Sequence, residues 1–158
     1  MGEYERNRKR LLRFIALEEQ RGYVFACTAD KHIRYSLNKQ MQAHLQLAGK
    51  QLSVLNLTQH KELTLIGQID FHVDQTKPDV LVIQGIEELL VHDASGELTQ
   101  AGLDNLIALN AYREYFHRLN RPIVFWINRI SLRAFGNIAV DLFTQRRLST
   151  LFFEKEGH

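Results

Sequence analysis

Several side chains that follow apolar segments could act on a phosphorylated ligand. Lys31 lies shortly after the apolar segment 23–27, and the pair Glu87 and Glu88 follows the apolar run 80–83. A lysine at a helix N-terminus can contact a phosphate, and a carboxylate can activate an attacking water. The residues that would form such a nucleotide site are Thr28, Lys31, Glu87, Glu88 and Asn128.

The sequence lacks the glycine-rich loop that normally holds the phosphates. Such a loop needs small residues so that backbone N–H groups converge on the anion, yet the segment 28–32 contains no glycine. Gln84 stands where an acid would hold magnesium, and its amide carries no charge. We therefore favour a solvated surface lysine for Lys31 and an acidic helix start for the Glu87–Glu88 pair over a nucleotide site. We predict no catalytic residue and favour a protein without enzymatic activity.

Other chemistries have weaker support. The seven histidines never fall in a spacing typical of metal ligands, apart from His72 with Asp74, so we predict neither a metal nor a cofactor. Cys27 is the single cysteine, which excludes a disulfide framework and a four-cysteine zinc site. Its place between an apolar strand and a helix fits either a buried structural thiol or an activated one, and we favour the buried thiol.

A charged group near the end of the chain could recognise a partner. Asp141, Arg146 and Arg147 combine one carboxylate with two guanidiniums, which bind acidic or phosphate groups well. Arg113, next to Glu114, is predicted to belong to an exposed charge pair. Arg113, Asp141, Arg146 and Arg147 are therefore the candidate partner-binding set, although we favour a solvated surface for them.

The apolar pattern predicts how these residues are positioned. Runs typical of buried strands alternate with helical periodicity, and Asp30 and Thr99 are suited to cap helices. Expected helices cover 4–21, 30–48, 99–120 and 130–145; expected strands cover 23–27, 51–57, 80–83, 122–127 and 148–153; 59–73 is a short helix or an irregular crossover. This alternation predicts an α/β fold, a three-layer α/β/α sandwich with a mainly parallel five-stranded sheet. Ligands of such sheets bind beyond the carboxyl ends of the strands.

Length and composition limit the range of functions. The chain has 158 residues and a formal net charge of +2, so we expect one domain over 1–158 and do not expect nucleic acid as its main partner. Its apolar runs are too short to cross a membrane, and we expect a cytoplasmic protein. Residues 1–21 are predicted to form an amphipathic helix that packs on or beside the domain. Its basic side chains would bind nucleic acid in an alternative interpretation; they are Arg6, Arg8, Lys9, Arg10 and Arg13.

Three short blocks resemble a family of regulatory proteins. Leu109-Asn110-x-x-Arg113-Glu114-x-Phe116, the run 122–127 and the run 139–143 are similar to "LN..RE.F", "PIVFW" and "APDLW" of bacterial signal-transduction P-loop ATPases, the class with the NACHT and NB-ARC switches. More narrowly, the chain resembles a bacterial branch of this class that has lost the phosphate loop, also called Walker A. Val140 replaces the expected proline, and Gln84 replaces the usual acid.

The resemblance implies a P-loop NTPase-like scaffold used for regulation or assembly. The leading hypothesis is a non-catalytic domain that binds another protein, or itself, in bacterial signalling or defence. A weak nucleotide-binding or hydrolysing domain is the first alternative, and a nucleic-acid module using the basic N-terminal helix is the second.

Overall fold

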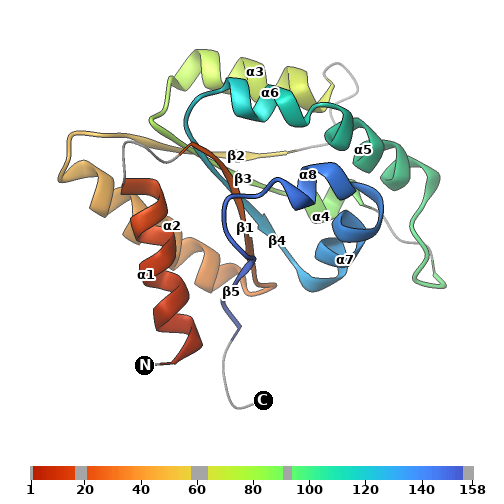
Figure 1. Cartoon of the computed structure of the whole chain (residues 1–158), viewed down its shortest axis with the longest axis horizontal. Helices are drawn as coiled ribbons and strands as arrows, with labels where there is room; N and C mark the ends of the chain where they lie inside the picture. The colour runs from red at the N-terminus through yellow and green to blue at the C-terminus, as the bar shows by residue number, and fades with distance from the viewer. Residues whose placement is uncertain (1, 17–20, 58–63, 91–93, 155–158) are drawn as a thin grey trace.

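Five parallel strands form the central sheet of the computed structural model, which describes residues 2–16, 21–57, 64–90 and 94–154. The strands are β1 (Gly22–Cys27), β2 (Leu52–Asn56), β3 (Val80–Gln84), β4 (Pro122–Ile127) and β5 (Leu151–Phe152). Their order across the sheet is β2-β3-β4-β1-β5 (Figure 1). The predicted parallel five-stranded sheet is thereby confirmed.

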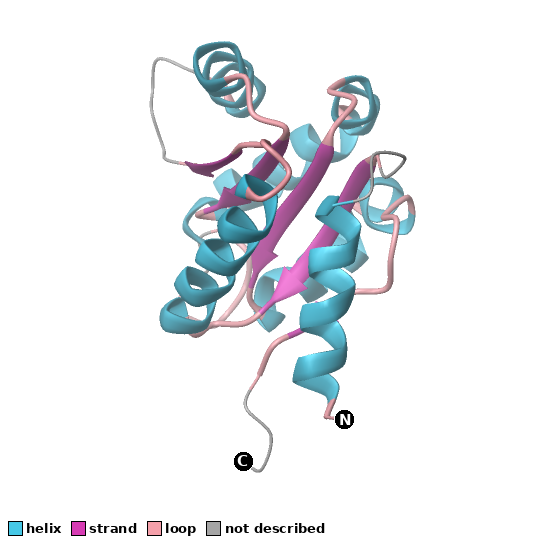
Figure 2. Cartoon of the chain, turned by 90° about the vertical axis from the view of Figure 1, so that its left-hand side faces the viewer, coloured by secondary structure: helices cyan, strands magenta, loops and turns pink. Residues whose placement is uncertain are grey.

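Helices cover both faces of this sheet (Figure 2). The helices are α1 (Glu3–Ala16), α2 (Lys31–Gln46), α3 (Leu65–Thr76), α4 (Ile86–Leu89), α5 (Gln100–Ala111), α6 (Arg113–Arg118), α7 (Arg129–Ile138) and α8 (Val140–Thr144). The first two pack on one face, and the others pack on the opposite face. Among the described helices, none is long and apolar enough to span a membrane.

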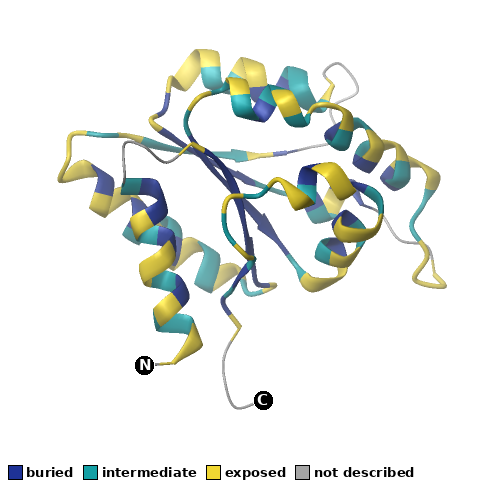
Figure 3. Cartoon of the chain, viewed as in Figure 1, coloured by how far each residue is buried: buried dark blue, intermediate teal, exposed yellow. Residues whose placement is uncertain are grey.

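The three inner strands are apolar on both faces because both faces are covered. Every residue of β1 and β4 is buried (Figure 3). Alternate residues point to opposite sides, so Phe25 and Phe125 stack at 5.3 Å on the side of α3 to α8, while Trp126 lies on the side of α1 and α2. The edge strand β2 is only half-buried, in agreement with the polar Ser53 within it.

Helix α1 is held to the far edge of the sheet by a buried polar contact. The Asn7 side chain, 6% exposed, donates from Nδ2 to the Phe152 carbonyl of β5 at 2.9 Å. The predicted end of this helix at residue 21 is wrong. Its described part is Glu3–Ala16, Arg21 is not helical, and Gly22 begins β1 with φ +97°; residues 17–20 lie outside the described residues.

Two other predicted helices are each divided in the structure. The helix expected over 99–120 breaks at Tyr112, and the one expected over 130–145 breaks at Ala139, whose ψ of 55° is not helical. The second break lets Leu142 turn into the core, where its N–H donates to Asn110 Oδ1 at 2.9 Å. The last strand is also shorter than expected, two residues instead of the stretch 148–153.

Candidate functional site

A cavity of about 610 Å³ opens at the carboxyl ends of the strands, where the sequence places ligand binding. It is formed by the loop after β1, the first turns of α2, the ends of β2 and β3, and the residue after β4. Its lining residues are Ala29, Lys31, Arg34, Tyr35, Asn38, Asn56, Gln84, Gly85, Glu87, Glu88 and Asn128.

The connection from β1 to α2 is short and closed by its own side chain. Three residues join Cys27 to Lys31, and none is a glycine. The Asp30 carboxylate accepts from the backbone N–H of His32 at 2.8 Å and of Ile33 at 3.3 Å, as its predicted capping role requires. Free N–H groups at a helix N-terminus are what binds phosphate in nucleotide sites. Here an internal carboxylate occupies two of them.

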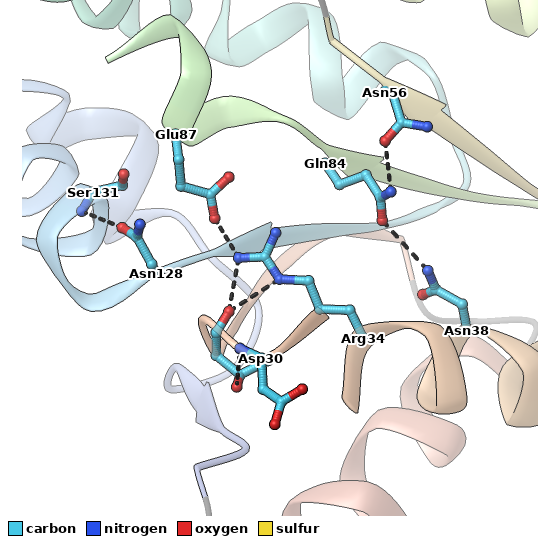
Figure 4. A network of polar contacts seen from close by, with 9 residues as sticks. Asp30, Arg34, Asn38, Asn56, Gln84, Glu87, Asn128 and Ser131 are labelled. Carbon is cyan, nitrogen blue, oxygen red and sulfur yellow. Dashed lines mark hydrogen bonds and ion pairs between the residues drawn. The ribbon is translucent and has the colours of Figure 1, made fainter. Parts of the chain in front are cut away.

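Arg34 joins two of the segments that line the cavity (Figure 4). Its guanidinium donates to the Thr28 carbonyl from Nε at 3.0 Å and from Nη2 at 2.7 Å, and Nη2 also pairs with the Glu87 carboxylate. Both side chains are mostly buried, with 13% and 20% of their surface exposed. Glu87, one of the two carboxylates considered as a general base, is therefore already engaged by a cation of the same chain.

A row of amides continues from this ion pair (Figure 4). Asn38 Nδ2 donates to Gln84 Oε1 at 3.4 Å, and Gln84 Nε2 donates to Asn56 Oδ1 at 2.5 Å. The buried Trp126 donates from Nε1 to Asn38 Oδ1 at 2.8 Å. These bonds join α2 to β2, β3 and β4. They also use both ends of the Gln84 amide at the position where P-loop NTPases use an acid to hold magnesium.

Gly85 allows the strand ends to approach closely. Its φ is +88°, and a Cβ at this position would lie 2.6 Å from the Leu57 carbonyl oxygen. The Leu57 N–H donates to the Gln84 carbonyl at 2.8 Å. The backbone after β3 is therefore held against the backbone after β2, which fixes where Glu87 lies.

The cavity brings together four of the five predicted nucleotide-site residues. Lys31, Glu87, Glu88 and Asn128 line it, whereas Thr28 is 2% exposed and contributes its carbonyl to Arg34. Asn128 Oδ1 accepts from the Ser131 N–H at 2.8 Å and so caps α7. The described residues contain no group of three or more histidine, cysteine, aspartate or glutamate side chains that could hold a metal ion.

Residues missed by the sequence analysis supply most of the hydrogen bonds. They are Arg34, Asn38 and Asn56. Arg34 and Asn38 are four residues apart in α2 and therefore share one face, which was the available signal. Their distant partners lie in β3, β4 and α4, and the sequence does not reveal such distant pairs.

Cys27 is a buried structural thiol, as favoured from the sequence. Its side chain is fully buried at the end of β1. Burial raises the pKa of this thiol to about 11, so it stays protonated at neutral pH.

Arg147, one of the predicted partner-binding residues, lies at the amino end of the sheet, away from the cavity. Arg147 packs over Gly22 at the start of β1, with its Cγ 2.8 Å from the place of a Cβ there. Asp141 is exposed. The prediction of an exposed pair for Arg113 and Glu114 is wrong in part, because Arg113 is half-buried and its Nε atom has no contact with solvent.

Comparison with known proteins supports the fold. No protein-family model and no curated protein matches the chain. A solved structure of the ORC1 protein of Aeropyrum pernix, in complex with DNA, is similar with a TM-score of 0.58 and 11% sequence identity. The match covers 99% of this chain and 46% of the ORC1 chain, so this chain spans less than half of that protein. The likeness confirms the predicted P-loop NTPase-like α/β fold.

Proposed function

We propose that this chain is a P-loop-like domain without catalytic activity, which acts as a protein-interaction or assembly module in bacterial signalling or defence. The observation that carries the proposal is the closed connection between β1 and α2. Asp30 occupies the N–H groups that would bind a phosphate, and Arg34 spans the space between Thr28 and Glu87.

A nucleotide phosphate would have to displace these groups. Loss of a helix cap costs about 0.5–2 kcal/mol, and the displaced Asp30 carboxylate would remain close to the incoming anion and repel it. The short connection offers no glycine to bring further N–H groups toward the phosphate. A scaffold with the phosphate site closed in this way fits a role in binding or assembly.

Thermal unfolding with and without ATP or GTP and magnesium tests the proposal. A ligand at 100 times its dissociation constant stabilises a fold by about 2.7 kcal/mol, which is a rise in melting temperature of roughly 5–10 °C for a chain of this size. We expect no rise. A rise that disappears in Lys31→Ala or Glu87→Gln would overturn the proposal and establish the alternative of a weak nucleotide-binding domain.

A second candidate function is nucleic-acid binding through α1. Positions 6, 9, 10 and 13 lie on one face of this helix at helical spacing, and all four carry exposed basic side chains: Arg6, Lys9, Arg10 and Arg13. The opposite face packs on the domain through Leu11, Phe14 and Ile15. The ORC1 protein with a similar fold is in complex with DNA, which adds to this candidate.

Salt dependence of binding to random double-stranded DNA tests this second candidate. If four cations neutralise four phosphates, the logarithm of the binding constant falls with the logarithm of salt concentration with a slope of about −3 to −4. The double variant Arg10→Gln, Arg13→Gln would reduce the slope by about 2. Absence of binding at low salt removes this candidate and leaves the first proposal untouched.

A further inference from the structure

The strand β2 forms one edge of the sheet, and no strand among the described residues lies beyond it (Figure 1). Two flanking residues show how its backbone is turned. The Gln51 carbonyl accepts from the first N–H of β3 at 3.2 Å, and the Leu57 N–H donates to the last carbonyl of β3 at 2.8 Å. The direction of these groups alternates along a strand. The residues whose N–H and C=O groups face away from the sheet are therefore Leu52, Val54 and Asn56.

The opposite edge of the sheet, at β5, is closed. The Phe153 N–H donates to the Cys27 carbonyl of β1 at 2.9 Å, so the backbone of the preceding Phe152 faces outward. The outward Phe152 carbonyl accepts the Asn7 side chain of α1. The strand is also only two residues long. Short edge strands and a covering helix are devices by which proteins prevent pairing with another chain.

The β2 edge differs from the β5 edge in length and in composition. It is five residues long, and it carries neither a charged side chain nor a proline, which are the other usual protections of an edge. Leu52 and Val54 pack partly against the core on the side of α2, and Leu55 does so on the side of α3. All three side chains are only half-buried. This uncharged edge is suited to pair with a further strand.

We infer that β2 pairs with β2 of a second copy of this chain, antiparallel about a twofold axis at Val54. In this register Val54 lies opposite Val54 of the second copy, and Leu52 lies opposite Asn56 of the second copy. These residues all face outward, so each opposed pair exchanges both of its N–H···O=C bonds. The inference rests on the proposed protein-interaction function and names the partner as a second copy.

The edge is complementary to itself. The twofold axis brings two β-branched valines together and places no like charges opposite one another, because β2 is uncharged. Tyr35 of α2, 61% exposed, lines the cavity together with Asn56, so an exposed ring stands at the end of the edge where Leu52 of the second copy arrives.

The closed β5 edge limits the assembly to two copies. A twofold pairing uses the β2 edge of both chains, and the remaining edges are the two closed β5 edges. Pairing through one self-complementary surface gives a closed dimer, whereas pairing through two different surfaces would give an open chain of copies.

Sedimentation equilibrium of the full chain at about 10–500 µM tests the inference, because a pairing of single short strands is a small interface and requires a high concentration. We expect the average mass to rise with concentration from 18.4 kDa toward twice this value. Species larger than a dimer would overturn the closed twofold pairing.

Charged variants at the twofold axis test the register. Val54→Lys and Val54→Glu each place like charges opposite one another, and we expect each variant alone to dimerise at least tenfold more weakly than the unmodified chain. An equimolar mixture of the two should regain the dimer, since the opposed charges then attract. Ala43→Lys adds the same charge at an exposed position of α2 and is the matched control, which should dimerise like the unmodified chain.

Val54→Cys gives an independent measurement if the charged variants fail to fold. The Cα atoms of a hydrogen-bonded antiparallel pair lie about 5.5 Å apart, within the range of a disulfide. With oxidised glutathione as the oxidant, we expect the linked dimer to form at least tenfold faster in Val54→Cys than in Ala43→Cys. The natural Cys27 does not compete, because it is buried and stays protonated at neutral pH.

Four results would overturn the inference: a chain that stays monomeric at the highest concentration, a Val54→Lys variant that dimerises like the unmodified chain, a mixture of the folded charged variants that stays monomeric, or equal rates of linkage in the two cysteine variants. A monomeric chain is the result expected if β2 pairs with a strand of another protein instead. That result leaves the proposed interaction function in place, whereas a stabilisation by ATP and magnesium would overturn the proposed function whatever the mass.

Discussion

Arg34 of α2 and Glu87 of α4, which both line the cavity, form an ion pair although they are 53 residues apart in the chain. The same guanidinium donates twice to the Thr28 carbonyl, so one side chain joins the ends of β1 and β3. This contact occupies the space between the elements that would hold a nucleotide in a P-loop NTPase. The proposal that this chain keeps a P-loop-like fold without catalytic activity depends on this contact.

Removal of one member of this pair should destabilise the chain. Glu87→Gln leaves Arg34 mostly buried without its counter-charge, and we expect a loss of about 1–3 kcal/mol in the free energy of unfolding, measured with urea. Asp74→Asn, a neutralisation at an exposed position, is the control and should change stability by less than about 0.5 kcal/mol. The double variant Arg34→Gln, Glu87→Gln should lose less stability than the sum of the losses of the two single variants. We expect this difference, the coupling energy, to be at least about 0.5 kcal/mol. Strict additivity would show that the pair is not formed.

The cap of α2 gives a second prediction. Asp30→Ala leaves the N–H groups of His32 and Ile33 without their acceptor and should cost about 0.5–2 kcal/mol. Asp30→Ser keeps a capping oxygen and should restore most of this loss. Equal urea midpoints for the two variants would contradict the capping role.

Substitutions at Gly85 and Gly96 distinguish the cost of a positive φ from the cost of a Cβ that meets the backbone. Both have a positive φ, but only at Gly85 would a Cβ meet a backbone atom, the Leu57 oxygen at 2.6 Å. Gly96→Ala should therefore cost only the conformational term of about 1–2 kcal/mol. We expect Gly85→Ala to cost clearly more, because the backbone after β3 must move. Equal losses in urea unfolding would mean that the strand ends separate easily.

Burial of Cys27 predicts how stability changes in alkaline solution. Burial raises the pKa of its thiol from 9.0 to about 11. The unfolded thiol loses its proton near pH 9 and the folded one near pH 11, so the stability that this group contributes is complete below pH 9 and is lost between pH 9 and 11. Unfolding free energies at pH 8 and pH 10 should differ more in the unmodified chain than in Cys27→Ala. Iodoacetamide should also label the native thiol far more slowly than the thiol in urea, and rapid native labelling would argue against burial.

The strands and helix starts could be predicted because their causes are local. The run 80–83 is apolar at every position. This pattern is typical of a strand that is covered on both faces. Asp30 and Thr99 accept from N–H groups two or three residues ahead, a distance that the sequence displays directly. Helix ends were harder to predict. The break at Ala139 accompanies burial of Leu142 and its hydrogen bond to Asn110, a residue from another helix.

Some features of the candidate site could likewise be predicted from the sequence, and others depend on the tertiary structure. The sequence by itself determined the absent phosphate loop, the neutral Gln84 and the sheet edge where a cavity had to be sought, because residue type and strand order express these features. Only the tertiary structure decided that Arg34 pairs with Glu87. Such long side chains have many partners within reach along the chain. Packing of the helices on the sheet selects one of them.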